Sequence, residues 1–348
     1  MSISNPSIAD MRIAFAGAGA FGVPTLQRLV EAKANVVRVY TQPDRPAGRG
    51  KKMTPTPIAE AAAAMGLEVV RTADLNAETL PDIDALVVIA FGQKIASHIV
   101  DKPKFGAINL HASLLPKYRG AAPIHAAILA GEPVAGNSII RLAEKMDAGN
   151  VLGTVELAIH PNETTGELHD RLAVAGAPLV EQVLEQLRSG DAIEVQQDHA
   201  AATLARKLSR ESTRIDFNRP PQSVADQIRG LYPWPGCRVR LLDGADEVAR
   251  LTLVRARLAP APGIPGAGLS SSGASGKPGG PDSNPLPAYR ERGQEVVPGT
   301  VTAEGHVACG DGGIELIEVQ PEGRRPMTLA AYRNGRPWTA GLRLESIV

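Results

Sequence analysis

MRIAFAGAGAFGVPTLQRLVEAKANVVRVY, residues 11–40, is the stretch that decides the fold. Residues 11–16 form a short apolar run that leads into glycines, which is typical of a buried strand. Residues 23–32 have helical spacing, and residues 36–40 are again apolar and valine-rich. A strand, a helix and a second strand in this order predict the first unit of a parallel α/β sheet.

The alternation of strands and helices continues toward the middle of the chain. Further strands are expected at residues 85–90, 107–110, 138–142 and 151–159, and helices at 57–64, 121–130 and 165–187. Gly131 and Gly190 stand where the last two helices should stop. This part is therefore predicted to be an α/β domain with a mostly parallel sheet and helices on both faces.

After about residue 191 the pattern changes to a polar stretch followed by short alternating segments. These segments lie at 237–242, 248–258, 299–303 and 314–319, and they predict a small antiparallel β-barrel or sandwich. Residues 260–287 are rich in Pro, Gly and Ser. Because they cannot bury enough apolar surface to offset ordering, a disordered insertion inside the second domain is expected.

Composition narrows the functional classes. The chain has 348 residues, enough for two domains, and its 37 basic and 37 acidic residues give zero net charge. A balanced charge removes the simplest argument for a nucleic-acid partner, although the second half is mildly basic. Two cysteines, no apolar run long enough to span a bilayer and no visible targeting signal predict a cytoplasmic protein without a membrane partner.

Gly17, Gly19 and Gly22 form a G-x-G-x-x-G pattern after the first strand. A dinucleotide site would also need an acid at the end of the second strand, but that strand ends in Tyr40 and Thr41. Tight packing of strand against helix is therefore the favoured interpretation of these glycines.

Residues 105–120, FGAINLHASLLPKYRG, carry the clearest chemical pattern. Asn109 and His111 are two apart, so on a strand they project from one face, while Ile108 and Leu110 point the other way. They stand at the carboxyl end of the strand, where open α/β sheets bind ligands. Taken alone, this pattern also fits a structural histidine.

A carboxylate could join this pair from MDAGN, residues 146–150. Asp147 lies in a loop after a predicted strand, where a simple turn is the alternative. If the loop covers the same sheet edge, the carboxylate would face His111 and keep it protonated. An amide, an imidazole and a carboxylate suit acyl transfer without a covalent intermediate, because no Ser or Cys with an adjacent base is evident.

Residues 42–57, QPDRPAGRGKKMTPTP, predict a long loop that glycines make flexible. The loop carries Arg45, Arg49, Lys51 and Lys52 against a single acid. It could contact phosphates, or it could be a solvated surface.

Five segments together resemble the methionyl-tRNA formyltransferase family, within the wider group of enzymes that use 10-formyltetrahydrofolate. They are TQPDRPAGRGKK (41–52), NLHASLLPKYRGAAPI (109–124), MDAGN (146–150), KLSRESTRIDF (207–217) and YPWPG (232–236). The segment around Asn109 and His111 is shared with other folate enzymes, so it supports the chemistry. The basic loop and the second domain favour the tRNA-acting member.

The resemblance implies a Rossmann-like catalytic domain at 1–195, a linker at 196–213 and an OB-like β-barrel at 214–348 that helps hold initiator Met-tRNA. It makes Asn109, His111 and Asp147 the catalytic trio. The residues expected near the folate are Ser113, Leu114, Leu115, Pro116, Phe91, Gly92, Gln93 and Ile95. Those expected against the tRNA acceptor end are Arg45, Arg49, Lys51 and Lys52.

One turn departs from the family's pattern. The family has Gly-Thr-Pro followed by an acid and Phe, whereas this chain has Gly17, Ala18, Gly19, Ala20 and Phe21. This chain therefore lacks the acid of that turn, while the trio is unaffected.

The expected reaction is attack of the methionine α-amine on the formyl carbon of 10-formyltetrahydrofolate, by a monomer without a metal ion. Asn109 and His111 would stabilise the oxyanion, assisted by Asp147. The histidines show no HExxH spacing and the cysteines no pairing, so the sequence offers no metal site. Alternatives are an amino-sugar formyltransferase, a formyltetrahydrofolate hydrolase, a non-catalytic RNA-binding protein and, more distantly, a dehydrogenase.

Overall fold

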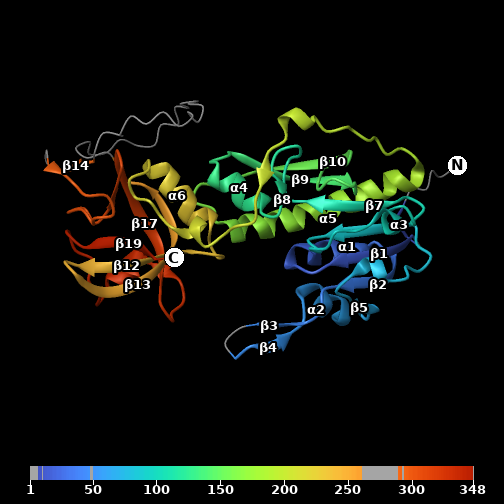
Figure 1. Ribbon diagram of the computed structural model, residues 1–348, viewed down its shortest axis with the longest axis horizontal. Helices are drawn as coiled ribbons and strands as arrows, with labels where there is room; N and C mark the ends of the chain where they lie inside the picture. Colours follow the sequence, from blue (N-terminus) through green and yellow to red (C-terminus); the bar gives the residue numbers. More distant parts are fainter. Residues whose placement is uncertain (1–6, 10, 48–49, 261–288, 292–293, 348) are drawn as a thin grey trace. The chain divides into compact units, whose positions relative to one another are not determined.

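The computed structural model describes residues 7–9, 11–47, 50–260, 289–291 and 294–347. The chain divides into two compact units (Figure 1). The first comprises Met1–Ala127, Glu132–Ile159 and Glu167–Lys207, and the second comprises Ile128–Gly131, His160–Gly166 and Leu208–Val348. The expected insertion at 260–287 lies outside the described residues, apart from Pro260.

The first unit is built on a seven-stranded sheet in the order β10-β9-β7-β6-β1-β2-β5. Its strands are β1 (Arg12–Gly17), β2 (Asn35–Thr41), β5 (Val69–Arg71), β6 (Ala85–Ile89), β7 (Ala107–His111), β9 (Val134–Arg141) and β10 (Val151–Ala158). The first five are parallel, which confirms a mostly parallel sheet. However, β9 runs antiparallel to β7, and β10 runs antiparallel to β9.

Helices cover both faces of this sheet. They are α1 (Val23–Glu31), α2 (Pro57–Ala64), α3 (Ser97–Val100), α4 (Pro123–Leu129) and α5 (Thr165–Ser189), with 3-10 turns η1 (Ala20–Gly22), η2 (Leu75–Ala77) and η3 (His199–Ala201). The long helix α5 lies close against the sheet, because a Cβ atom on Gly176 would be 2.6 Å from Leu110 of β7. Gly190, with φ of +82°, follows its end, as expected.

The glycine pattern after β1 has a packing explanation. A Cβ atom on Gly17 would lie 2.7 Å from the Phe15 ring and 2.9 Å from the Ile89 carbonyl oxygen. One on Gly22 would lie 3.1 Å from the same ring, whereas Gly19 has room for a Cβ. The close packing of this turn therefore requires glycine at position 17 and leaves little room for a side chain at position 22.

The basic stretch is not the structureless loop that the sequence indicated. Strands β3 (Arg45–Ala47) and β4 (Lys52–Thr54) pair antiparallel as a hairpin, with Arg45 opposite Thr54. The prediction was wrong because prolines, glycines and charges give no apolar alternation, so the backbone pairing left no trace in the sequence.

The second unit contains an antiparallel sheet in the order β16-β17-β13-β12-β19, with β18 paired to β17. Its elements are η4 (Glu211–Thr213), α6 (Pro221–Gly230), β12 (Cys237–Asp243), β13 (Asp246–Leu258), β14 (Arg290–Glu291), β15 (Gln294–Glu295), β16 (Val307–Cys309), β17 (Gly312–Pro321), β18 (Met327–Thr328), α7 (Leu329–Arg333) and β19 (Arg343–Ile347). Residues 299–302 hydrogen-bond to both edge strands, β19 and β16. The expected small antiparallel barrel is thus confirmed as a curled sheet whose edges are linked.

Within the part of the chain that the structure describes, no helix is both long enough and apolar enough to cross a membrane.

Candidate active site

Strand β7 presents the amide and the imidazole on one face. Leu110 packs toward Gly176 of α5, so its neighbours Asn109 and His111 lie on the opposite face, as their spacing predicts. His111 is 6% exposed, and Asn109 is half-buried. The Asn109 amide has no hydrogen-bond partner among the described residues. Its two N–H donors are therefore available to a ligand.

The hydrogen bonds of His111 identify the nitrogen that can act. Nε2 lies 2.9 Å from the backbone oxygen of Tyr118. A carbonyl only accepts, so Nε2 must carry a proton and donate it there. Nδ1 is left to face the site, 3.7 Å from Oδ2 of Asp147.

The turn after β7 holds the Tyr118 carbonyl, the partner of His111, in place. The Ser113 hydroxyl donates to the Lys117 carbonyl at 2.7 Å, and the Ser138 hydroxyl donates to the Ser113 carbonyl at 2.7 Å. The Tyr118 hydroxyl donates to Glu132 at 2.7 Å. Burial, with the contact to Glu132, raises the pKa of Tyr118, and the same hydrogen bond lowers the pKa of Glu132.

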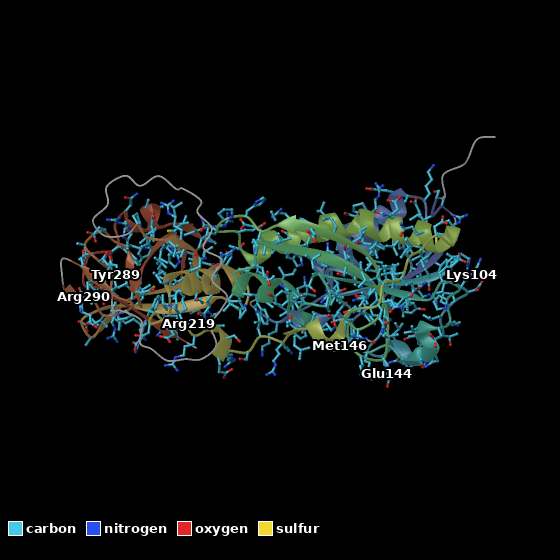
Figure 2. All side chains as sticks on the ribbon, turned by 90° about the horizontal axis from the view of Figure 1, so that it is seen from above. Lys104, Glu144, Met146, Arg219, Tyr289 and Arg290 are labelled. Atoms are coloured by element: carbon cyan, nitrogen blue, oxygen red, sulfur yellow. The ribbon has the colours of Figure 1, made fainter. Side chains whose placement is uncertain are left out.

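Asp147 reaches His111 by a route that the sequence did not indicate. Because β9 is antiparallel to β7, its last residue, Arg141, pairs with Ile108 at the start of β7. The loop then turns back; Glu144 and Met146 stand at the surface of this unit (Figure 2), Met146 being 73% exposed. The Asp147 side chain is only 14% exposed.

The backbone around Asp147 is tightly fixed. Asp147 has φ of +52°, an uncommon conformation for a residue other than glycine. Its Oδ2 accepts a hydrogen bond from the Gly120 N–H at 2.8 Å. A Cβ atom on Gly149 would lie 1.9 Å from the Arg141 carbonyl oxygen, so the loop can pass there only with glycine. The structure thus brings Asn109, His111 and Asp147 to one part of the first unit.

The residues expected near a folate differ in what they can offer. Ser113, Leu114, Leu115 and Pro116 directly follow His111; Ser113 is 3% exposed and the other three are partly exposed. Phe91 is 3% exposed and Ile95 packs against the same core, so the Phe91 ring is committed to packing. These folate contacts remain predictions.

The loop after β6 is similarly self-contained. The Gln93 amide donates to the Thr72 carbonyl at 2.9 Å and accepts from the Leu75 N–H at 2.8 Å. Gly92 has φ of +76°, which suits the turn between Phe91 and Gln93. Because the Phe91 and Gln93 side chains are used within the protein, the loop after β6 offers a ligand mainly its backbone atoms.

The basic residues lie on the β3–β4 hairpin. Lys51 and Lys52 are exposed, and the Arg45 guanidinium donates to the Gln42 side chain at 2.8 Å. The acid of this stretch, Asp44, pairs instead with Arg71. Arg45, Lys51 and Lys52 have no ion-pair partner among the described residues, and Arg49 lies outside them.

Comparison with known proteins identifies the family to which this chain belongs. Residues 11–184 match the family described as formyl transferase, and residues 207–337 match the formyl transferase C-terminal domain. The sequence is 40% identical over 338 residues to the methionyl-tRNA formyltransferase of Moorella thermoacetica, covering 95% of this chain and 98% of that protein. The chain belongs to the methionyl-tRNA formyltransferase family. The methionyl-tRNA formyltransferase of Cereibacter sphaeroides is 39% identical over 342 residues, covering 97% of this chain and all of that one. A member of this family is a transferase, and so is this protein.

Solved structures share the fold of this family at much lower identity. The sugar 3N-formyl transferase WlaRD, studied with dTDP and 5-N-formyl-THF, gives a TM-score of 0.58 at 15% identity, covering 90% of this chain and 99% of that one. The N-formyltransferase from Helicobacter canadensis, studied with folinic acid and dTDP-3-aminofucose, gives 0.59 at 16%, covering 87% and 98%. At this identity the likeness concerns the fold alone.

One further feature of this family member was not anticipated. Gln197 is 6% exposed and hydrogen-bonds to the Asp147 loop and to Arg119. Arg119 and Gly120 lie in a segment that carried the resemblance, but Gln197 lies in a polar stretch without periodicity, so no sequence pattern could indicate its position. Among the described residues, no group of three or more His, Cys, Asp or Glu side chains could hold a metal ion.

Proposed function

We propose that this protein transfers the formyl group of 10-formyltetrahydrofolate to the α-amino group of methionine on initiator Met-tRNA, in the cytoplasm. The observation that carries the proposal is identity of up to 40%, over nearly the whole chain, to proteins named methionyl-tRNA formyltransferase. Solved structures of the same fold were determined with 5-N-formyl-THF or tetrahydrofolic acid, which supports a folate as formyl donor.

In the proposed mechanism, the neutral amine attacks the formyl carbon and forms the new C–N bond. The carbonyl electron pair moves onto oxygen, giving a tetrahedral oxyanion. The bond to N10 then breaks, the carbonyl re-forms, and N10 takes up the proton that the amine loses, directly or through water. Tetrahydrofolate and formylmethionyl-tRNA are the products.

Asn109 and His111 supply the donors for the oxyanion. The Asn109 amide is unpartnered among the described residues, and the His111 Nε2–H is already donated to Tyr118. The second donor must therefore be the Nδ1–H of a protonated ring, which the Asp147 carboxylate stabilises from 3.7 Å. Asp147 can also relay the proton between amine and N10.

The hairpin is proposed to contact the tRNA acceptor end. Exposed Lys51 and Lys52, with Arg45, offer positive charge that no acid among the described residues neutralises. Replacing Arg45, Arg49, Lys51 and Lys52 by Ala should weaken tRNA binding and flatten its salt dependence. An unchanged salt slope would place the RNA contact elsewhere.

The central test is single-turnover formylation of Met-tRNA by the Asn109→Ala and His111→Ala variants. Each should lower the chemical rate by about 10² to 10³-fold, the usual loss for one oxyanion donor. Near-normal rates in both folded variants would eliminate the oxyanion role.

A second assay compares acceptors: initiator Met-tRNA, elongator Met-tRNA, a dTDP-amino sugar and water. Formylation of the sugar nucleotide, or hydrolysis of the folate, without formylation of Met-tRNA would reject the proposed acceptor.

A further inference from the structure

Gln197 is held beside the edge of the first unit's sheet. Val195 pairs antiparallel with Val151 through two backbone hydrogen bonds of 2.8 Å. Two residues later the Gln197 side chain is 6% exposed, whereas its neighbour Gln196 is exposed. A long polar side chain that is buried must have its hydrogen bonds satisfied, and Gln197 does.

Every donor and acceptor of the Gln197 amide is used. Nε2 donates to the Asp147 carbonyl at 2.8 Å and to the Gly149 carbonyl at 2.7 Å. Oε1 accepts from Nη2 and Nε of Arg119 at 2.6 and 3.1 Å. The flipped amide would set N–H groups against the guanidinium and oxygen against two carbonyls, so only one orientation fits.

Hydrogen bonds therefore hold Asp147 at both its backbone carbonyl and its carboxylate. Gln197 holds its backbone carbonyl, and the Gly120 N–H holds its carboxylate at 2.8 Å. Gly120 is itself fixed, because β8 (Arg119–Gly120) pairs with β11 (Leu204–Ala205) and a Cβ atom on Gly120 would lie 2.5 Å from the Ala205 oxygen.

We propose that Gln197 is a positioning residue for formyl transfer, fixing the Asp147 loop so that the carboxylate faces Nδ1 of His111. The inference rests on the proposed function of Asp147. An uncommon positive φ persists only where the surroundings impose it. Here the preceding residue, Met146, is 73% exposed and contributes little. The two Gln197 hydrogen bonds, to the carbonyls of Asp147 and Gly149, therefore add to the restraint from the Gly120 N–H.

The test compares Gln197→Leu and Gln197→Glu with Gln196→Leu and Gln196→Glu, the matched controls. Glutamate at 197 keeps the contact to Arg119 but loses both donors, so it remains informative if the leucine variant does not fold. Both Gln197 variants should lower kcat about 10- to 100-fold, with the KM values for folate and Met-tRNA changed less than about twofold. The Gln196 variants should match the parent protein.

A double variant separates positioning from general stability. If Gln197 acts through Asp147, adding Gln197→Glu to Asp147→Asn should lower kcat no further than Asp147→Asn alone. Unchanged kcat in the folded Gln197 variants, or a full additional loss in the double variant, would overturn the inference. An Asp147→Asn variant with parental kcat would instead reject the proposed role of Asp147, and no formylation by the parent protein would reject the proposed function.

Discussion

Replacing Asp147 by Asn isolates the charge of the proposed trio. The His111 side chain is 7% exposed and that of Asp147 is 14% exposed. Nδ1 of His111 lies 3.7 Å from Oδ2 of Asp147. At that distance and an effective dielectric constant of about 20, opposite unit charges attract by about 4 kcal/mol. If the attraction is fully expressed in the transition state, its loss slows the reaction about 10³-fold. The amide oxygen of Asn can still accept from the Gly120 N–H, so the loop should keep its fold.

The assay is rapid-quench formylation of Met-tRNA with enzyme in excess, which reports the chemical step. Thermal melting checks that the variant is folded. Asp170→Asn is the matched control: Asp170 lies 2.8 Å from Nδ1 of His169, but its side chain is 82% exposed. The control should leave the rate unchanged. A folded Asp147→Asn variant with a rate within about threefold of the parent, less than 1 kcal/mol of barrier, would refute the electrostatic argument.

Three other outcomes follow from the structure. The lowered pKa of Glu132 means that its ionised form stabilises the fold above the ordinary carboxyl pKa of about 4.3 and that this contribution is lost as pH falls through the lower folded value. The deficit in melting temperature of Glu132→Gln should therefore be present in full at pH 7 and shrink as the pH falls below about 4.3. Gly17→Ala should destabilise the protein by about 1–3 kcal/mol in urea unfolding, whereas Gly19→Ala, which meets its nearest atom at 3.6 Å, should change it by less than about 1 kcal/mol; equal effects would reject the packing explanation. Burial raises the pKa of Cys237 and Cys309 to about 12, so a thiol reagent at pH 8 should label neither until the chain unfolds.

Local periodicity was enough to predict much of the first unit. The two-residue spacing of Asn109 and His111 predicted their common face, and Leu110 between them packs against α5, as expected. The order of strands and helices predicted the mostly parallel sheet, and the change of pattern after residue 191 predicted the second, antiparallel sheet.

Features that depend on pairing between distant segments could not be predicted. The direction of β9 relative to β7 carries no signature in either strand, although it sets the path of the Asp147 loop. The β3–β4 hairpin lacks apolar alternation. Gln197 is a polar residue in a polar stretch, and only the fold reveals that its amide is buried.

The pairing of β8 with β11 has a practical consequence for dissecting the protein. A version truncated after residue 184, where the formyl transferase match ends, would retain the amide, imidazole and carboxylate of the trio. It would nevertheless lack Leu204–Ala205, the strand that pairs with Arg119–Gly120. Without that pairing, the Gly120 N–H that binds the Asp147 carboxylate would no longer be fixed. The smallest fragment expected to keep its chemistry must therefore extend to Lys207, where the first compact unit ends.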